Sequence, residues 1–210
     1  MAVNKYPKKR EDGVNIMGVR IGVIGVGFGS VVHIPAFQSE GLEVVAVCAR
    51  NETRAEAAAK TFNIPHVFSD FQRMLEMPDL DAVSIVTPPA LHHEMALAAL
   101  NAGKHVLCEK PFALNSVQAR EMWEASEASG LTAMICHEFR FAASRMQVKE
   151  LIDEGYVGPL HMVVMNLANG PRGGFAARAS SYRDDSDQGS GFLGALGSHY
   201  IDCLRHWFGE

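Results

Sequence analysis

The chain has 210 residues, of which 48% are hydrophobic and 20% are charged, and its formal net charge is −5. This composition is typical of a globular protein with one sizeable core and part of a second. The net negative charge gives no electrostatic reason to expect nucleic acid or an anionic membrane as a partner. No apolar run is long enough to cross a bilayer. Residues 1–17 lack the apolar core of a secretory signal, so we expect a loose tail and a cytoplasmic protein.

Six apolar runs alternate with helix-like stretches from residue 19 onward. The runs predict strands at 19–26, 42–49, 66–68, 81–87, 104–109 and 131–137. The stretches between them predict helices at 30–40, 52–63, 70–77, 90–103 and 115–130. Near-continuous apolar strands joined by helices indicate a doubly wound parallel sheet that is covered on both faces, which is an α/β fold.

Several residues mark where these helices begin, end or bend. Pro35 lies inside the first helical stretch, where proline removes an amide donor, so that helix should kink or restart near His33. Gly103 and Gly130 stand where a C-terminal glycine is favoured. Asn115, or Ser116 after it, is placed to cap the fifth helix.

The pattern changes after residue 137. Residues 137–158 predict a loop and an amphipathic helix, 159–168 a strand, 169–188 a polar glycine-rich connection that contains three arginines, and 189–210 a helix. The lone strand needs a partner: it adds to the main sheet, pairs with another chain, or belongs to a fragment of a longer protein. The predicted organisation is a tail over 1–17, a doubly wound α/β domain over 18–137 and a partial second domain over 138–210.

The first strand is followed directly by a glycine-rich turn. Gly25, Gly27 and Gly29, with Ser30 in the place of the third glycine, match the dinucleotide-binding fingerprint. Glycine permits the tight turn and lets the backbone approach a pyrophosphate, which the following helix N-terminus favours. The turn stands between the first predicted strand and the first predicted helix, which is the position that a dinucleotide-binding fingerprint requires. The alternative is a tight glycine turn without a ligand.

The tip of the second strand bears on the choice of cofactor. An NAD site usually has an acidic residue there for the ribose hydroxyls, whereas this chain has Arg50. A guanidinium pairs with a 2′-phosphate, which favours NADP over NAD, with NAD still open. In the alternative reading Arg50 is a solvated helix start and Glu52 binds the ribose.

Polar residues also follow the fourth and fifth strands. Thr87 and Pro88 end the fourth strand, and His92 and His93 fall in the next helical turn, where a histidine pair is more often structural than catalytic. Lys110 follows the fifth strand at the same carboxyl edge of the sheet, where ligands bind in such folds. A lysine there is placed to hydrogen-bond to, or exchange a proton with, a reacting hydroxyl. The alternative is a surface lysine paired with Glu109.

Three stretches together resemble the Gfo/Idh/MocA oxidoreductase family: GVIGVGFGSVVHIPAF, VTPPALHHEMALAALNAGKHVLCEKPFALN and GFLGALGSHYIDCLRHWFGE. The resemblance covers about residues 18–210 and implies a Rossmann domain followed by an α/β domain with an open sheet. It implies NAD(P)-dependent hydride transfer on sugars, cyclic polyols and related hydroxy compounds. The family's catalytic lysine falls on Lys110. Its cofactor contacts fall on Gly25, Gly27, Phe28, Gly29, Ser30, Arg50, Thr87, Pro88, His92, Glu109, Lys110 and Arg140.

The resemblance also implies a catalytic histidine, and here the chain departs from the family. His199 matches the histidine, but Ala195 occupies the place of the aspartate four residues earlier. The two positions share one helical face, so a carboxylate at 195 would lie beside His199. Asp202, three residues after His199, is a second candidate to orient it, and a structural role is favoured for Asp202.

These observations predict a cytoplasmic NADP-preferring oxidoreductase with a sugar or polyol substrate, in which Lys110 and His199 act on the substrate. The competing reading is a truncated or non-catalytic dinucleotide-binding protein with a sensor-like role. The resemblance implies a further sheet that carries much of the substrate surface and often the oligomer interface, and we expect this chain to supply one strand of it. The oligomeric state is left open, with a homo-oligomer as one alternative. The four cysteines have no metal-ligand spacing, and we expect them to be reduced and no metal to be bound.

Overall fold

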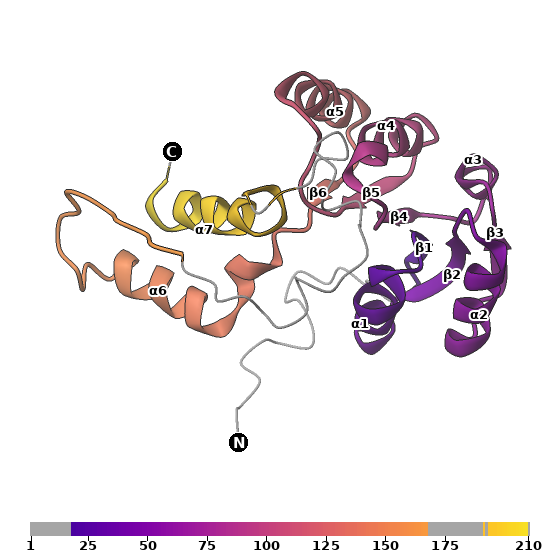
Figure 1. Cartoon of the computed structure of the whole chain (residues 1–210), viewed down its shortest axis with the longest axis horizontal. Coiled ribbons are helices and arrows are strands. Elements are labelled where there is room, and N and C mark those ends of the chain that lie inside the picture. Colours follow the sequence, from indigo (N-terminus) through magenta and orange to yellow (C-terminus); the bar gives the residue numbers. More distant parts are fainter. Residues whose placement is uncertain (1–17, 168–190, 192, 210) are drawn as a thin grey trace. The chain divides into compact units, whose positions relative to one another are not determined.

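The computed structural model of the chain describes residues 18–167, 191 and 193–209 (Figure 1). The predicted tail over 1–17 and the arginine-containing connection over 169–188 lie outside the described residues.

Six strands form one sheet. Their bounds are β1 Arg20–Ile24, β2 Glu43–Cys48, β3 His66–Phe68, β4 Ala82–Ile85, β5 His105–Cys108 and β6 Ala133–Ile135. Their order in the sheet is β3-β2-β1-β4-β5-β6, and β1 pairs in parallel with both β2 and β4. The strand order therefore reverses at β1, which is the arrangement of a Rossmann fold. The predicted doubly wound α/β fold is confirmed.

The helices near β1 to β3 follow the predicted positions. A π-helical turn over Gly29–His33 leads into α1, Ile34–Ser39, and α2 and α3 span Glu52–Phe62 and Phe71–Leu75. Pro35 stands in the first turn of α1, where its missing amide hydrogen costs no helical hydrogen bond. The predicted restart near His33 is confirmed.

The next helices show the predicted end signals. A 3-10 turn over Pro89–Leu91 precedes α4, His92–Asn101, and α5 spans Ser116–Ser129. The Asn115 side chain accepts hydrogen bonds from two amides of the first turn of α5, so Asn115 is the N-cap. Gly103 and Gly130 follow the two helices with φ of 73° and 64°, a conformation that favours glycine.

The chain divides into two compact units, one made of residues up to 86 with 98–106, and the other of 87–97 with 107 onward. In the first unit, β1 and β2 supply a buried apolar core that includes Val23 and Val47. The helix α2 covers this core with the small side chains of Ala55, Ala58 and Ala59, which let it approach β2 and β3 closely.

The second unit contains the elements that follow β6. A 3-10 turn, η3, spans Glu138–Phe141 and leads into α6, Ala143–Asp153. A π-helical turn over Leu193–Gly197 leads into α7, Ser198–Phe208. The helices α6 (orange) and α7 (yellow) run side by side in Figure 1. The indole of Trp207 joins them by donating a hydrogen bond to the Arg145 carbonyl at 3.0 Å.

The predicted strand over 159–168 is wrong for its described part. Residues 159–167 adopt no regular secondary structure, and Met162 and Val164 are largely exposed. A strand is stable only where its backbone groups pair with a neighbour, and no described segment of the second unit pairs with this one.

All four cysteines are free thiols, as expected. Cys48, Cys108 and Cys203 are buried, and Cys136 is partly buried. Burial raises the pKa of Cys48 to about 11, and burial with the nearby Glu109 carboxylate raises the pKa of Cys136 to about 12. Among the described helices, none combines the length and the apolar character that a bilayer crossing requires.

Candidate active site

The glycine turn of the first unit has the geometry that its sequence predicts. Gly25 has a φ of 106°, and its amide donates to the Cys48 carbonyl at 2.8 Å, which turns the chain sharply at the end of β1. A Cβ on Gly27 would meet nothing nearer than the Arg54 guanidinium at 4.0 Å, so the backbone is open to close approach there. A Cβ on Gly29 would lie 3.0 Å from Val23, so this glycine permits close packing of helix on strand.

The beginning of the first helix adds polar groups next to this turn. The Ser30 hydroxyl is buried and has no hydrogen-bond partner among the described residues. Phe28 is half-exposed. A bare backbone at Gly27, a helix N-terminus and an unpaired hydroxyl together fit the pyrophosphate of a dinucleotide, because each offers a donor to an anion.

Two arginines of the first unit, Arg50 and Arg54, follow the end of β2. Arg50 is exposed just after β2, and Asn51 caps α2 by accepting a hydrogen bond from the Arg54 amide at 3.0 Å. Arg54 itself was not among the predicted site residues, although a Cβ on Gly27 would lie 4.0 Å from its guanidinium. The signal available was its place in the first turn of the helix that follows β2, three residues after the Asn51 N-cap.

In the second unit, His92 is fully buried and holds two chain segments together. Its Nδ1 lies 2.9 Å from the Pro111 carbonyl and its Nε2 lies 3.0 Å from the Thr87 carbonyl. Burial lowers the pKa of His92. His93, by contrast, pairs with Glu121 at 2.6 Å. The described contacts of His92 are therefore with the backbone around Thr87, Pro88 and the cis Lys110–Pro111 peptide.

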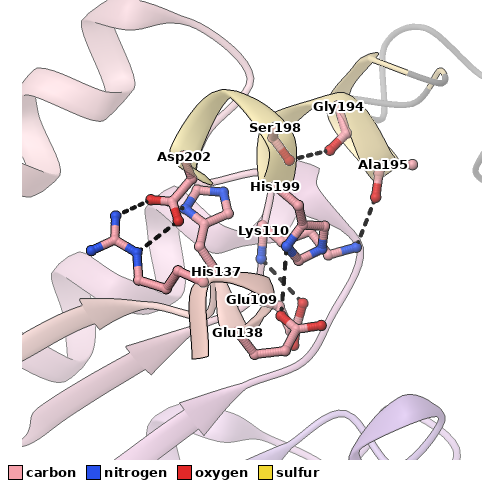
Figure 2. Close-up of polar contacts among 10 residues, drawn as sticks. Glu109, Lys110, His137, Glu138, Gly194, Ala195, Ser198, His199 and Asp202 are labelled. Atoms are coloured by element: carbon pink, nitrogen blue, oxygen red, sulfur yellow. Dashed lines mark hydrogen bonds and ion pairs between the residues drawn. The ribbon is translucent and has the colours of Figure 1, made fainter. Parts of the chain in front are cut away.

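Lys110 points toward the turn that precedes α7. Its Nζ donates a hydrogen bond to the Ala195 carbonyl at 3.0 Å (Figure 2). The side chain is partly buried. Glu109 is buried, and its carboxylate accepts from the Lys110 backbone amide at 3.2 Å and from the Cys136 thiol. The lysine is thus held by the late helical segment and is not a fully solvated surface group.

His199 lies on α7 at the centre of an aromatic cluster. Its side chain is 2% exposed, and the Phe139 ring stacks on it with 4.0 Å between centroids. The ring of His137 meets it edge-on at 5.6 Å. Burial, with the positive charge of Lys110, lowers the pKa of His199 to about 4. The imidazole is therefore neutral at pH 7.

The carboxylate of Asp202 contacts Arg140 and His137. Its carboxylate accepts two hydrogen bonds from the Arg140 guanidinium, one of them from Nε at 2.8 Å, and lies 3.5 Å from Nδ1 of His137. This confirms the structural role favoured for Asp202. Arg140, the predicted cofactor contact after β6, is engaged in this ion pair.

Two residues near His199 were missed from the sequence. His137 and Glu138 lie two and three residues after the end of β6, and Figure 2 shows both beside His199 and Lys110. The signal available was their place at the carboxyl end of a strand in a sheet of this kind, where ligands bind. The structure thus gathers Lys110, His137, Glu138 and His199 in the second unit, and the glycine turn with the two arginines in the first.

Comparisons with known proteins identify the family of the chain. Residues 19–137 match the profile described as an oxidoreductase family with an NAD-binding Rossmann fold, and residues 146–210 match the GFO/IDH/MocA C-terminal domain. An uncharacterized oxidoreductase of Synechocystis sp. is 35% identical over 190 residues, which cover 90% of this chain and 51% of that protein. D-glucoside 3-dehydrogenase of Escherichia coli is 32% identical, with 91% of this chain and 54% of that protein covered.

Solved structures that resemble this chain are also oxidoreductases. The WlbA dehydrogenase of Bordetella pertussis, in complex with NADH and UDP-GlcNAcA, superposes with a TM-score of 0.80 and 29% identity, covering 91% of this chain and 58% of that one. The chain spans about half the length of the relatives that it matches. The match over both segments shows that the chain belongs to the Gfo/Idh/MocA family of oxidoreductases with an NAD-binding Rossmann fold.

Proposed function

We propose that the protein is an NAD(P)-dependent oxidoreductase that transfers a hydride between the nicotinamide and a hydroxyl-bearing carbon of a sugar, a cyclic polyol or a related compound. The observation that carries the proposal is in the second unit. There the Lys110 ammonium binds the Ala195 carbonyl, and the buried neutral imidazole of His199 lies one helical turn further along the chain. An ammonium and a neutral imidazole in one site are the groups that proton transfer at a hydroxyl requires.

We assign the catalytic roles to Lys110 and His199. The Lys110 ammonium donates a hydrogen bond to the reacting oxygen and favours the negative charge that develops on it. The neutral His199 accepts the hydroxyl proton in oxidation and returns it in reduction. The bound dinucleotide supplies the hydride chemistry, and the surrounding burial of His199 keeps bulk water away from the imidazole.

The cofactor contacts remain proposals of the same kind. Gly25, Gly27, Phe28, Gly29 and Ser30 would hold the pyrophosphate, for which the open backbone and the unpaired hydroxyl are the support. Arg50 would bind a 2′-phosphate and so favour NADP over NAD, since it is exposed at the tip of β2.

We place the remaining predicted contacts at the nicotinamide end, where they follow β4, β5 and β6. They are Thr87, Pro88, His92, Glu109, Lys110 and Arg140.

The substrate class rests on the relatives. Their names include a levoglucosan dehydrogenase, 30% identical, and a D-glucoside 3-dehydrogenase, 32% identical. Both names denote oxidation of a carbohydrate. A cytoplasmic location and a homo-oligomer stay predictions.

One observation favours a second candidate, a dinucleotide-binding protein without turnover. Ala195 offers only a methyl group where the family resemblance implies a carboxylate next to His199. Such a protein would bind the dinucleotide at the glycine turn and have a sensor-like role without catalysing a reaction.

Steady-state oxidation of a panel of sugars, glycosides and cyclic polyols, with NAD and NADP in parallel, tests the proposal. Turnover of at least one panel member, at a rate that depends on the dinucleotide, is the expected result. Tight dinucleotide binding measured by fluorescence titration, with no turnover of any panel member in either direction, would overturn it in favour of the second candidate.

A further inference from the structure

The Nδ1 atom of His199 faces the carboxylate of Glu138, which was not among the predicted site residues. This nitrogen is buried and has no hydrogen-bond partner among the described residues. The carboxylate Oε2 of Glu138 lies 3.7 Å from it (Figure 2). A buried ring nitrogen without a partner is costly, so a group that approaches it closely is a candidate to bind it.

Within the part of the chain that the structure describes, other carboxylates are less well placed to act on this nitrogen. Position 195 carries a methyl group, so the helical turn before His199 offers no acid. Asp202, on the turn after it, is held by the Arg140 guanidinium and lies near His137. Glu109 accepts from the Lys110 amide and the Cys136 thiol. Glu138 has an ion-pair contact with His199, its Oε2 lying 3.7 Å from Nδ1.

Phe139, the residue after Glu138, holds the η3 turn against the imidazole of His199. Phe139 stacks on the His199 ring with 14° between the two planes, so η3 and α7 are held together at this point. The Glu138 side chain is 52% exposed, whereas the imidazole is 2% exposed. A shift of roughly 0.8 Å would bring the two groups to an ordinary N–H···O distance.

We propose that Glu138 is a positioning residue of the reaction: its carboxylate accepts a hydrogen bond from Nδ1–H of His199 and so leaves the lone pair on Nε2 free to exchange a proton with the substrate. The inference rests on the proposed function for the identity of that reaction. Catalytic hydrogen bonds are often long in a ligand-free site and tighten when the substrate binds, which suits a contact of 3.7 Å.

The electrostatic surroundings explain why His199 needs this carboxylate. Burial and the charges of Lys110 and His137 lower the pKa of His199, whereas the carboxylates of Glu109 and Asp202 raise it. The net result, a pKa of about 4, makes the imidazole a weak proton acceptor at pH 7. A carboxylate bonded to Nδ1–H stabilises the imidazolium that forms when Nε2 takes a proton, as in other His–carboxylate pairs.

The test compares Glu138→Ala, which removes the acceptor, with Glu138→Gln, which keeps an oxygen acceptor but removes the charge. Glu150→Gln is the matched control, because it removes one exposed carboxylate from α6 of the same unit. Ring ¹⁵N shifts of the intact, ¹⁵N-histidine-labelled chain give the tautomer and the pKa of His199, with His199→Asn for assignment. Steady-state kinetics against pH are measured on the same variants.

In the wild type and in Glu150→Gln, we expect the tautomer with hydrogen on Nδ1. Glu138→Ala should lose this preference, lower the pKa of His199 further and reduce kcat about tenfold to hundredfold. Glu138→Gln should keep the tautomer and lose rate by a smaller factor. A tautomer and a pKa of His199 that are the same in Glu138→Ala as in the wild type overturn the inference. Absence of wild-type turnover overturns the proposed function alone, because the ¹⁵N measurement still reports on Glu138.

Discussion

The ammonium of Lys110 donates a hydrogen bond to the carbonyl of Ala195, 85 residues further along the chain. This contact joins the turn after β5 to the π-helical turn that precedes α7. A lysine that is partly buried and directed at one carbonyl has lost much of its rotamer freedom, which is what a group that must meet a substrate oxygen requires.

Replacing Lys110 with alanine should abolish turnover while leaving dinucleotide affinity within about tenfold, because the ammonium acts on the reacting oxygen rather than on the pyrophosphate. Steady-state rates and fluorescence titration measure the two quantities separately. Lys149→Ala is the matched control, since Lys149 forms an ion pair with Asp153 on the surface of α6. Turnover that persists in Lys110→Ala at the level of the control would contradict the assigned role.

Replacing Arg50 with aspartate should reverse a preference for NADP, because a carboxylate at the tip of β2 repels a 2′-phosphate and accepts hydrogen bonds from the ribose hydroxyls. The ratio of the dissociation constants for NADP and NAD measures this. Arg73→Asp, on the exposed surface of α3, makes the same change in charge and should leave the ratio unaltered. An unchanged ratio in Arg50→Asp would remove the basis for the assignment to NADP.

The stability of the fold should fall as the pH drops from about 6.5 toward 4. Burial holds the pKa of His199 at about 4 in the folded chain, against an ordinary value of 6.5, and it also lowers the pKa of His92 and of His137. The unfolded chain therefore binds protons in this interval that the folded chain does not, and each pKa unit of difference is worth about 1.4 kcal/mol. Above about pH 7 these groups are neutral in both states and the dependence on them vanishes.

Urea unfolding midpoints at pH 7.5, 6 and 5 measure this dependence. We expect the midpoint urea concentration to decrease steadily from pH 7.5 to pH 5, and to decrease less in a His199→Gln variant. A midpoint that stays constant or rises between pH 7.5 and 5 would show that these histidines are not held neutral in the folded chain.

Replacing Asp202 with alanine should lower the free energy of unfolding by about 1–3 kcal/mol, because it leaves the half-buried Arg140 guanidinium without its carboxylate. Asp153→Ala breaks the exposed pair with Lys149 and should cost no more than about 0.5 kcal/mol. Denaturant titration of the two variants side by side measures the difference. Equal losses in the two variants would show that the Arg140–Asp202 pair is no stronger than a surface pair.

The parts of the fold that local chemistry determines were predictable from the sequence. Buried parallel strands are apolar along most of their length, so β1, β2 and β4 stand out as nearly continuous apolar runs. Asn115 and Gly130 mark the two ends of α5 because each satisfies backbone groups at a helix terminus. Pro35 marks the start of α1 for a similar reason, since the first helical turn does not use its missing amide hydrogen.

The parts that depend on contacts between distant segments were not predictable in the same way. The run over 159–167 has the composition of a strand, but pairing decides whether a strand forms. The approach of Glu138 to His199 depends on how η3 packs against α7, and no local pattern encodes that packing. The capture of Asp202 by Arg140, 62 residues away, follows from the same packing.

The burial of the four cysteine thiols has a practical consequence for spectroscopy. Alkylating probes react with the thiolate, and Cys48 and Cys136 have pKa values of about 11 and 12, so almost none of that form exists at neutral pH. Cys108 and Cys203 are likewise buried and their pKa values are raised. A cysteine introduced at an exposed position will therefore take up a maleimide dye or spin label far faster than the native ones, and distance measurements can begin without first removing them.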